Sequence, residues 1–152
     1  MKRLTGDEKK RICWRFKIMH NYITFLQKEK CMNNKLLQNI ISHLEFINSY
    51  YDLGIDFDDV PEDLTTREYD CLTSTMKSQV IENFRYYVIY VDLFKKIYKK
   101  INSSYFDNIE TEIRKINDYH KLKIWNENID DWNIYLPKFN YVTGRKYRFK
   151  VC

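Results

Sequence analysis

Three histidines carry the side chains best suited to acid–base or metal chemistry near neutral pH. They are His20, His43 and His120, and each falls in a different segment with a helical pattern. No two histidines have the H-x-x-x-H spacing, and no two cysteines the C-x-x-C spacing, that places metal ligands side by side. The sequence therefore predicts no metal site and no cofactor, and a structural or surface role for each histidine.

The four cysteines are widely spaced along the chain, at Cys13, Cys31, Cys71 and Cys152. Nucleophilic catalysis would need a thiolate within hydrogen-bonding reach of an imidazole. Cys13 and His20 are seven residues apart on one predicted helix, a separation of about 10 Å along its axis. The first three cysteines are therefore expected to be small apolar fillers of the core. The spacing indicates no disulfide framework, and with no signal-like or membrane-spanning stretch we expect an intracellular (cytoplasmic or nuclear) protein.

An acidic segment between residues 55 and 63 is the first candidate binding site. It contains Asp56, Asp58 and Asp59 and lies in a predicted loop. Clustered carboxylates suit hard cations, but this segment lacks the glycine and the terminal glutamate of the helix–loop–helix calcium pattern. It is interpreted either as a solvated loop or as a docking patch for a basic partner.

The C-terminal tail, about residues 122–152, is the second candidate binding site because aromatic and basic residues alternate in it. A three-residue turn ending at Arg145 would give a β-hairpin with its rings on one face and its charges on the other. Rings that stack on bases beside cations that meet phosphates would bind RNA or DNA. Rings that pack on the helices would instead leave a basic surface strand. The charged face would carry Lys138, Lys146, Arg148 and Lys150.

The composition excludes several classes of protein. Gly6, Gly54 and Gly144 are isolated from one another, so the glycine-rich loops that bind phosphates and dinucleotides are absent. The 26 basic and 21 acidic residues give a net charge of +5, which is no strong nucleic-acid footprint. The chain has no alanine and is rich in Ile, Asn, Lys, Tyr and Phe. That skew indicates an A+T-rich genome, as in large DNA viruses, microsporidia or apicomplexan parasites.

Hydrophobic periodicity predicts the first two helices. One runs over about residues 7–30, opened by a capping box of Thr5 and Glu8. A second apolar stripe follows Asn33-Asn34 and runs from Leu37 to Tyr51, and Gly54 is the predicted stop.

Three more helices are expected farther along the chain. Thr65 to Glu68 repeats the capping-box spacing, and a break is predicted at residues 73–75, where three cap-favouring residues follow one another. A long apolar line then continues to Ile101. Ser104 and Asp107 are predicted to cap the last helix, which ends near His120.

Residues 86–91 could form either of two structures. Six β-favouring residues in a row are typical of a buried strand. The apolar stripe on both sides has a helical period, so a central helix that is apolar nearly all round is favoured.

These patterns predict a mainly α single domain, 1–152: a bundle of about five helices over residues 7–120, around a central apolar helix, with a short C-terminal β-hairpin. Such a bundle resembles in architecture the Bcl-2-like folds of poxvirus host-modulating proteins. The resemblance implies a virus- or parasite-encoded modulator that binds host proteins.

The sequence thus favours a non-enzymatic, aromatic-rich domain that binds a protein partner. A subunit that binds nucleic acid through its tail is the alternative, and an enzyme with an unfamiliar site is the third hypothesis. The oligomeric state is left open.

Overall fold

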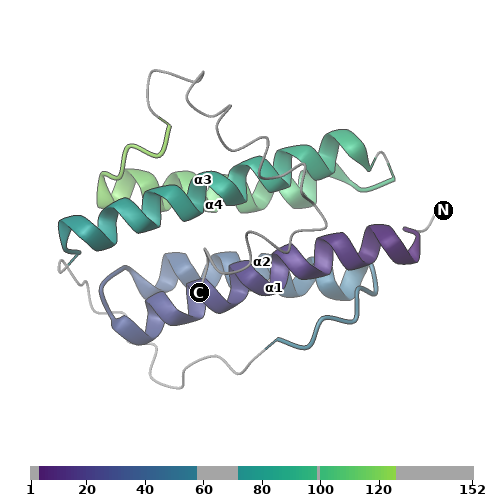
Figure 1. Ribbon diagram of the computed structural model, residues 1–152, viewed down its shortest axis with the longest axis horizontal. Helices are drawn as coiled ribbons and strands as arrows, with labels where there is room; N and C mark the ends of the chain where they lie inside the picture. Colours follow the sequence, from purple (N-terminus) through teal and green to yellow (C-terminus); the bar gives the residue numbers. More distant parts are fainter. Residues whose placement is uncertain (1–3, 58–71, 99, 126–152) are drawn as a thin grey trace.

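Four helices make up most of the structure, a computed structural model that describes residues 4–57, 72–98 and 100–125. They are α1 (Gly6–Glu29), α2 (Asn34–Tyr50), α3 (Ser74–Ile97) and α4 (Ser103–His120), and these residues contain no strand (Figure 1). The prediction of a mainly α chain is confirmed. The helix predicted to open at Thr65 and nearly all of the predicted tail hairpin lie outside the described residues, so the fifth helix and the hairpin stay predictions.

The helices form a bundle in which α1 and α4 each pack on both α2 and α3. In Figure 1, α1 and α3 lie nearer to the viewer, and α2 and α4 lie behind them. The Tyr51 hydroxyl accepts a hydrogen bond from the Asn102 backbone N–H, and His120 Nε2 accepts one from the Asn33 N–H. These two contacts join opposite ends of α2 and α4, so the two helices are antiparallel.

The order of the helices makes one connection long. Figure 1 shows α2 and α3 running in the same direction. The end of α2 and the start of α3 therefore lie at opposite ends of the bundle. An up-down-down-up bundle with one such crossover is an established arrangement of four helices.

Side chains at the helix ends explain where α1 and α3 begin. Thr5 and Glu8 form the predicted capping box, in which the Glu8 N–H donates to Thr5 Oγ1 over 3.1 Å and the Thr5 N–H to Glu8 Oε1 over 2.7 Å. Thr73 caps α3, so a helix begins at the position where the break was predicted, residues 73–75. Both caps satisfy amides that have no partner inside the helix.

Two predicted boundaries are wrong. The second helix ends at Tyr50 rather than at Gly54, because the chain already takes a left-handed conformation at Asp52, with φ 53°. The last helix is capped by Asn102, whose side chain accepts from the Ser104 N–H, and not by Ser104 or Asp107. The second helix thus ends close to the end of its apolar stripe at Tyr51 and before the glycine, and the last helix begins at the first residue able to cap it.

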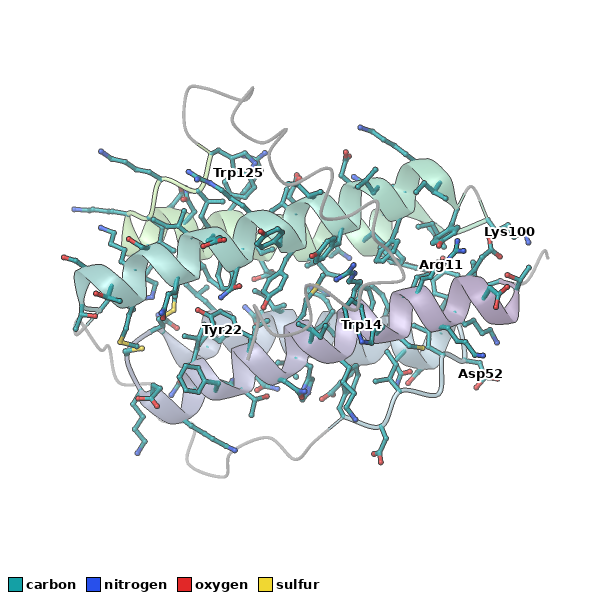
Figure 2. The ribbon with its side chains drawn as sticks, in the orientation of Figure 1. Arg11, Trp14, Tyr22, Asp52, Lys100 and Trp125 are labelled. Atoms are coloured by element: carbon teal, nitrogen blue, oxygen red, sulfur yellow. The ribbon has the colours of Figure 1, made fainter. Side chains whose placement is uncertain are left out.

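Residues 86–91 are helical, as predicted, and all six side chains are buried within α3. The main helix contacts of α3 are with α1 and α4. Phe16 of α1 joins both of these helices, because its ring centroid lies 6.4 Å from that of Phe94 and 5.7 Å from that of Phe106. The core is therefore shared by the helices and is rich in aromatic rings. Figure 2 shows Tyr22 of α1 in the same layer, between α1 and α3.

Candidate protein-binding face

Helix α2 is poor in charge. Only Lys35 and Glu45 are charged among its 17 residues, whereas 31% of the whole chain is charged. One side of α2 is buried in the core, through Leu37, Ile41 and Leu44 among others. The opposite side is exposed to solvent, and both charged residues, Lys35 and Glu45, lie there. Between and beyond them the exposed residues are uncharged: Ser42, Phe46, Ser49 and Tyr50. Depletion of charge is what distinguishes the centre of a protein interface from the rest of a protein surface.

Three aromatic rings lie together on this outer side, where α2 meets α4. Phe46 and Tyr50 are 47% and 45% exposed. The Tyr105 ring of α4 lies edge-on to both, with centroid distances of 5.0 Å to Phe46 and 4.8 Å to Tyr50. We call Phe46, Tyr50 and Tyr105 the aromatic patch. It is formed by two helices that are far apart in sequence, so only the fold brings its members together.

The aromatic patch is fixed to the core through Tyr51. The Tyr51 ring lies 4.9 Å from Tyr50 on one side and 6.3 Å from the buried Phe106 on the other. A side-chain hydrogen bond with Tyr50 raises the pKa of the Tyr105 hydroxyl. Rings held in place before a partner arrives lose little conformational entropy when it binds.

A polar cluster lies beside the patch on the same two helices. Its centre is Glu112 of α4, which is 7% exposed. Its carboxylate accepts from Asn39 Nδ2 of α2 and from Lys115 Nζ of α4, each over 3.2 Å. His43 Nε2 lies 3.8 Å from the same carboxylate. The cluster thus fixes the position of α4 along α2, and with it the patch.

Replacing Glu112 with alanine is expected to lower the free energy of unfolding by about 1–3 kcal/mol, because the Asn39 amide loses its acceptor at a largely buried position. Glu110→Ala is the matched control. Glu110 belongs to the same helix, but its ion pair with Arg114 is solvent-exposed, so a change below about 0.5 kcal/mol is expected. Urea denaturation followed by circular dichroism measures both. Equal losses would contradict the role given to Glu112.

The three histidines lie on three different helices, as predicted, and have different surroundings. His20 is buried and its ring stacks on that of Phe57 at 4.2 Å. His120 accepts from the Asn33 N–H at the start of α2. His20 Nδ1 also lies 3.4 Å from Thr24 Oγ1, one turn farther along α1, whereas His43 Nε2 faces the Glu112 carboxylate. In the part of the chain that the structure describes, no three His, Cys, Asp or Glu side chains are arranged to hold a metal ion.

One buried cation was not predicted. Arg15 of α1 is 1% exposed, and its guanidinium lies 4.2 Å from the Trp14 ring and 4.3 Å from the Tyr90 ring. Arg15 Nη1 donates to the Tyr90 hydroxyl over 3.3 Å, and burial lowers the pKa of the guanidinium. A guanidinium between aromatic faces keeps favourable electrostatic contacts away from water. Arg15 follows Ile12 by three residues, so the predicted apolar stripe could have indicated that Arg15 lies on the buried side of the helix.

Of the binding-site residues predicted from the sequence, the structure describes one, Asp56. It is exposed, and its backbone carbonyl accepts from Lys17 Nζ over 2.8 Å. The other predicted site residues lie outside the described residues: Asp58, Asp59, Lys138, Lys146, Arg148 and Lys150. Sequence reasoning missed the aromatic patch, although the scarcity of charge in residues 34–50 could have indicated it.

The structure describes two of the four cysteines. Cys31 is buried, as predicted for a core filler, and Cys13 is partly buried, with its thiol donating to the Leu53 carbonyl. Cys71 and Cys152 lie outside the described residues.

Together, the fold and the patch define an α-helical bundle with one crossover and an exposed cluster of three aromatic rings. No protein-family model, curated protein or solved structure matches the chain. None of the helices α1 to α4 combines the length and the apolar character needed to cross a membrane.

Proposed function

We propose that this protein is a non-enzymatic binding domain whose α2–α4 face docks on a helix of a partner protein. The observation that carries the proposal is the aromatic patch on a helix with two charged residues in 17. Aromatic side chains dominate the binding energy at the centres of interfaces, where they displace water over a large area. An exposed cluster of this kind costs solubility unless a partner covers it.

The surroundings of the patch define the chemistry of the partner. Ser42 and Ser49 of α2 and Asn108 of α4 are exposed and uncharged, and each lies within one helical turn of a patch ring. A charged group of the partner placed directly over the three rings would lose its hydration. We therefore expect the partner to offer a helix with apolar residues at i, i+3, i+4 and i+7 and no charge on that stripe. Such a helix packs against α2 and α4 as the helices of the bundle pack on one another.

A selection of helical peptides tests this proposal without a known partner. A display library of about 20-residue helical sequences, with every position varied, is selected against the immobilised full chain. We expect the selected peptides to share an uncharged apolar stripe. Their dissociation constants, measured by fluorescence anisotropy, are expected near 10 µM, that is, about −7 kcal/mol of binding free energy.

Phe46→Glu and Phe25→Glu form a matched pair of variants for this experiment. Both phenylalanines are 47% exposed, but Phe25 lies on α1, outside the α2–α4 face. Phe46→Glu is expected to weaken binding at least about tenfold, because a carboxylate in an apolar interface loses its hydration. Phe25→Glu is expected to change the dissociation constant less than about twofold. Equal effects of the two variants, or selected stripes that are charged, would overturn the proposal.

A further inference from the structure

A groove lies on α1, on another helix than those that carry the aromatic patch. There the segment that follows α2 folds back along the helix and leaves an open groove of about 920 Å³. Three kinds of contact hold the segment in place. The Cys13 thiol donates to the Leu53 carbonyl over 3.1 Å, and Lys17 Nζ to the Asp56 carbonyl over 2.8 Å. The Asn48 side chain bonds both the N–H and the carbonyl of Ile55. The far wall of the groove is therefore fixed to α1 and α2.

The floor of this groove is apolar. Trp14 and Ile18 of α1 line it, facing Ile55 of the segment, and Figure 2 shows Trp14 midway along α1. Cys13 adds an uncharged thiol, because burial raises its pKa. A concave surface with an apolar floor and a few polar groups at its edge is the usual form of a ligand site in proteins.

The rim of the groove is basic. Lys9, Lys10 and Lys17 line it, against one acidic residue, Asp56. Neither Lys9 nor Lys10 forms an ion pair with any residue that the structure describes. The groove therefore presents an excess of positive charge around an apolar floor, the complement of a ligand that is both acidic and apolar.

We propose that the groove binds a short acidic peptide segment of a partner protein in an extended conformation, with one bulky apolar side chain on Trp14 and Ile18 and carboxylates at the lysines. The dimensions fit such a segment. The α1 wall runs from Gly6 to Asn21, about 22 Å of helix, which about seven extended residues would span. Lys10 and Lys17 lie two turns apart, about 10 Å, which matches carboxylates three residues apart in an extended chain. This site is separate from the α2–α4 face and does not depend on it.

The test uses the full chain and a fluorescein-labelled peptide of about seven residues, with a central phenylalanine and glutamates on both sides. Fluorescence anisotropy should show saturable binding with a dissociation constant of about 10–100 µM. The double variant Lys9→Glu with Lys10→Glu should bind at least about tenfold more weakly. The control pair, Lys121→Glu with Lys123→Glu, changes the net charge equally at two exposed positions beyond α4. Its effect should stay below about twofold, since distant exposed charges are screened by salt.

A third variant tests the apolar floor. Ile55→Gln keeps the backbone that Asn48 holds and adds no charge, so it should weaken binding about threefold to tenfold while the helicity stays unchanged. Three results would overturn the proposal. These are the absence of saturation at about 1 mM peptide, equal weakening by the two lysine pairs, and equal binding of a peptide with glutamine in place of every glutamate.

Discussion

The Phe16→Ala variant is expected to be less stable than the wild type by about 3–5 kcal/mol. Phe16 is fully buried, and its ring contacts Phe94 of α3 and Phe106 of α4. Truncation would leave a cavity at the point where three helices meet, and these helices cannot all close on it at once. Since small domains are stable by about 5–15 kcal/mol, the loss is a large fraction of the total. Urea denaturation followed by circular dichroism measures it.

Phe25→Ala is the control for this prediction. Phe25 belongs to the same helix, but its ring is 47% exposed and its ring contact is with Tyr22 of the same helix. Its removal should change the free energy of unfolding by no more than about 0.5 kcal/mol. If the two variants lost equal stability, Phe16 would not hold the three helices together.

The Val88→Pro variant is expected to cost about 3 kcal/mol or more. Val88 lies inside α3, where proline would remove the backbone hydrogen bond to the carbonyl four residues earlier and displace that carbonyl. Residues 86–91 are all buried, so a bent helix could not relax into solvent. The mid-point of urea denaturation is the measurement, with the slope of the transition checked for a change in cooperativity.

Ser74→Pro provides the comparison at the start of the same helix. Ser74 is the first residue of α3, and its N–H has no acceptor inside the helix. Thr73 before it is extended, with φ −71° and ψ 163°, the conformation that a residue before proline prefers. A change below about 0.5 kcal/mol is expected. A large loss from Ser74→Pro, or none from Val88→Pro, would be inconsistent with a helix from Ser74 to Ile97.

The local parts of the fold could be predicted from the sequence. The Thr5 and Glu8 capping box and the cap at Thr73 depend on residues within one turn of each other. Residues 86–91 were predicted as helix because the stripe on either side has a helical period, and that period outweighed the β propensity of the six residues themselves. Tertiary packing decides such cases, since a buried helix gives β-branched and aromatic side chains as many contacts as a strand would.

The surfaces could not be predicted in the same way. The aromatic patch forms because Tyr105 of α4 lies beside Phe46 and Tyr50 of α2. No local sequence pattern indicates which helices are neighbours. Burial of Arg15 likewise depends on Tyr90 from α3. The groove exists because residues 53–56 fold back along α1, although Gly54 was predicted only to end a helix. Each feature rests on contacts between residues distant in sequence.

The docking of a helix on the α2–α4 face can be tested most directly by site-specific photo-crosslinking to a selected peptide. Benzoylphenylalanine replaces Phe46 in one preparation and Phe25 in another, two positions with the same exposure on different faces of the bundle. We expect the peptide to become attached to the protein that carries the probe at position 46, and not to the protein that carries it at position 25. Attachment at position 25 alone, or equally at both positions, would contradict the account.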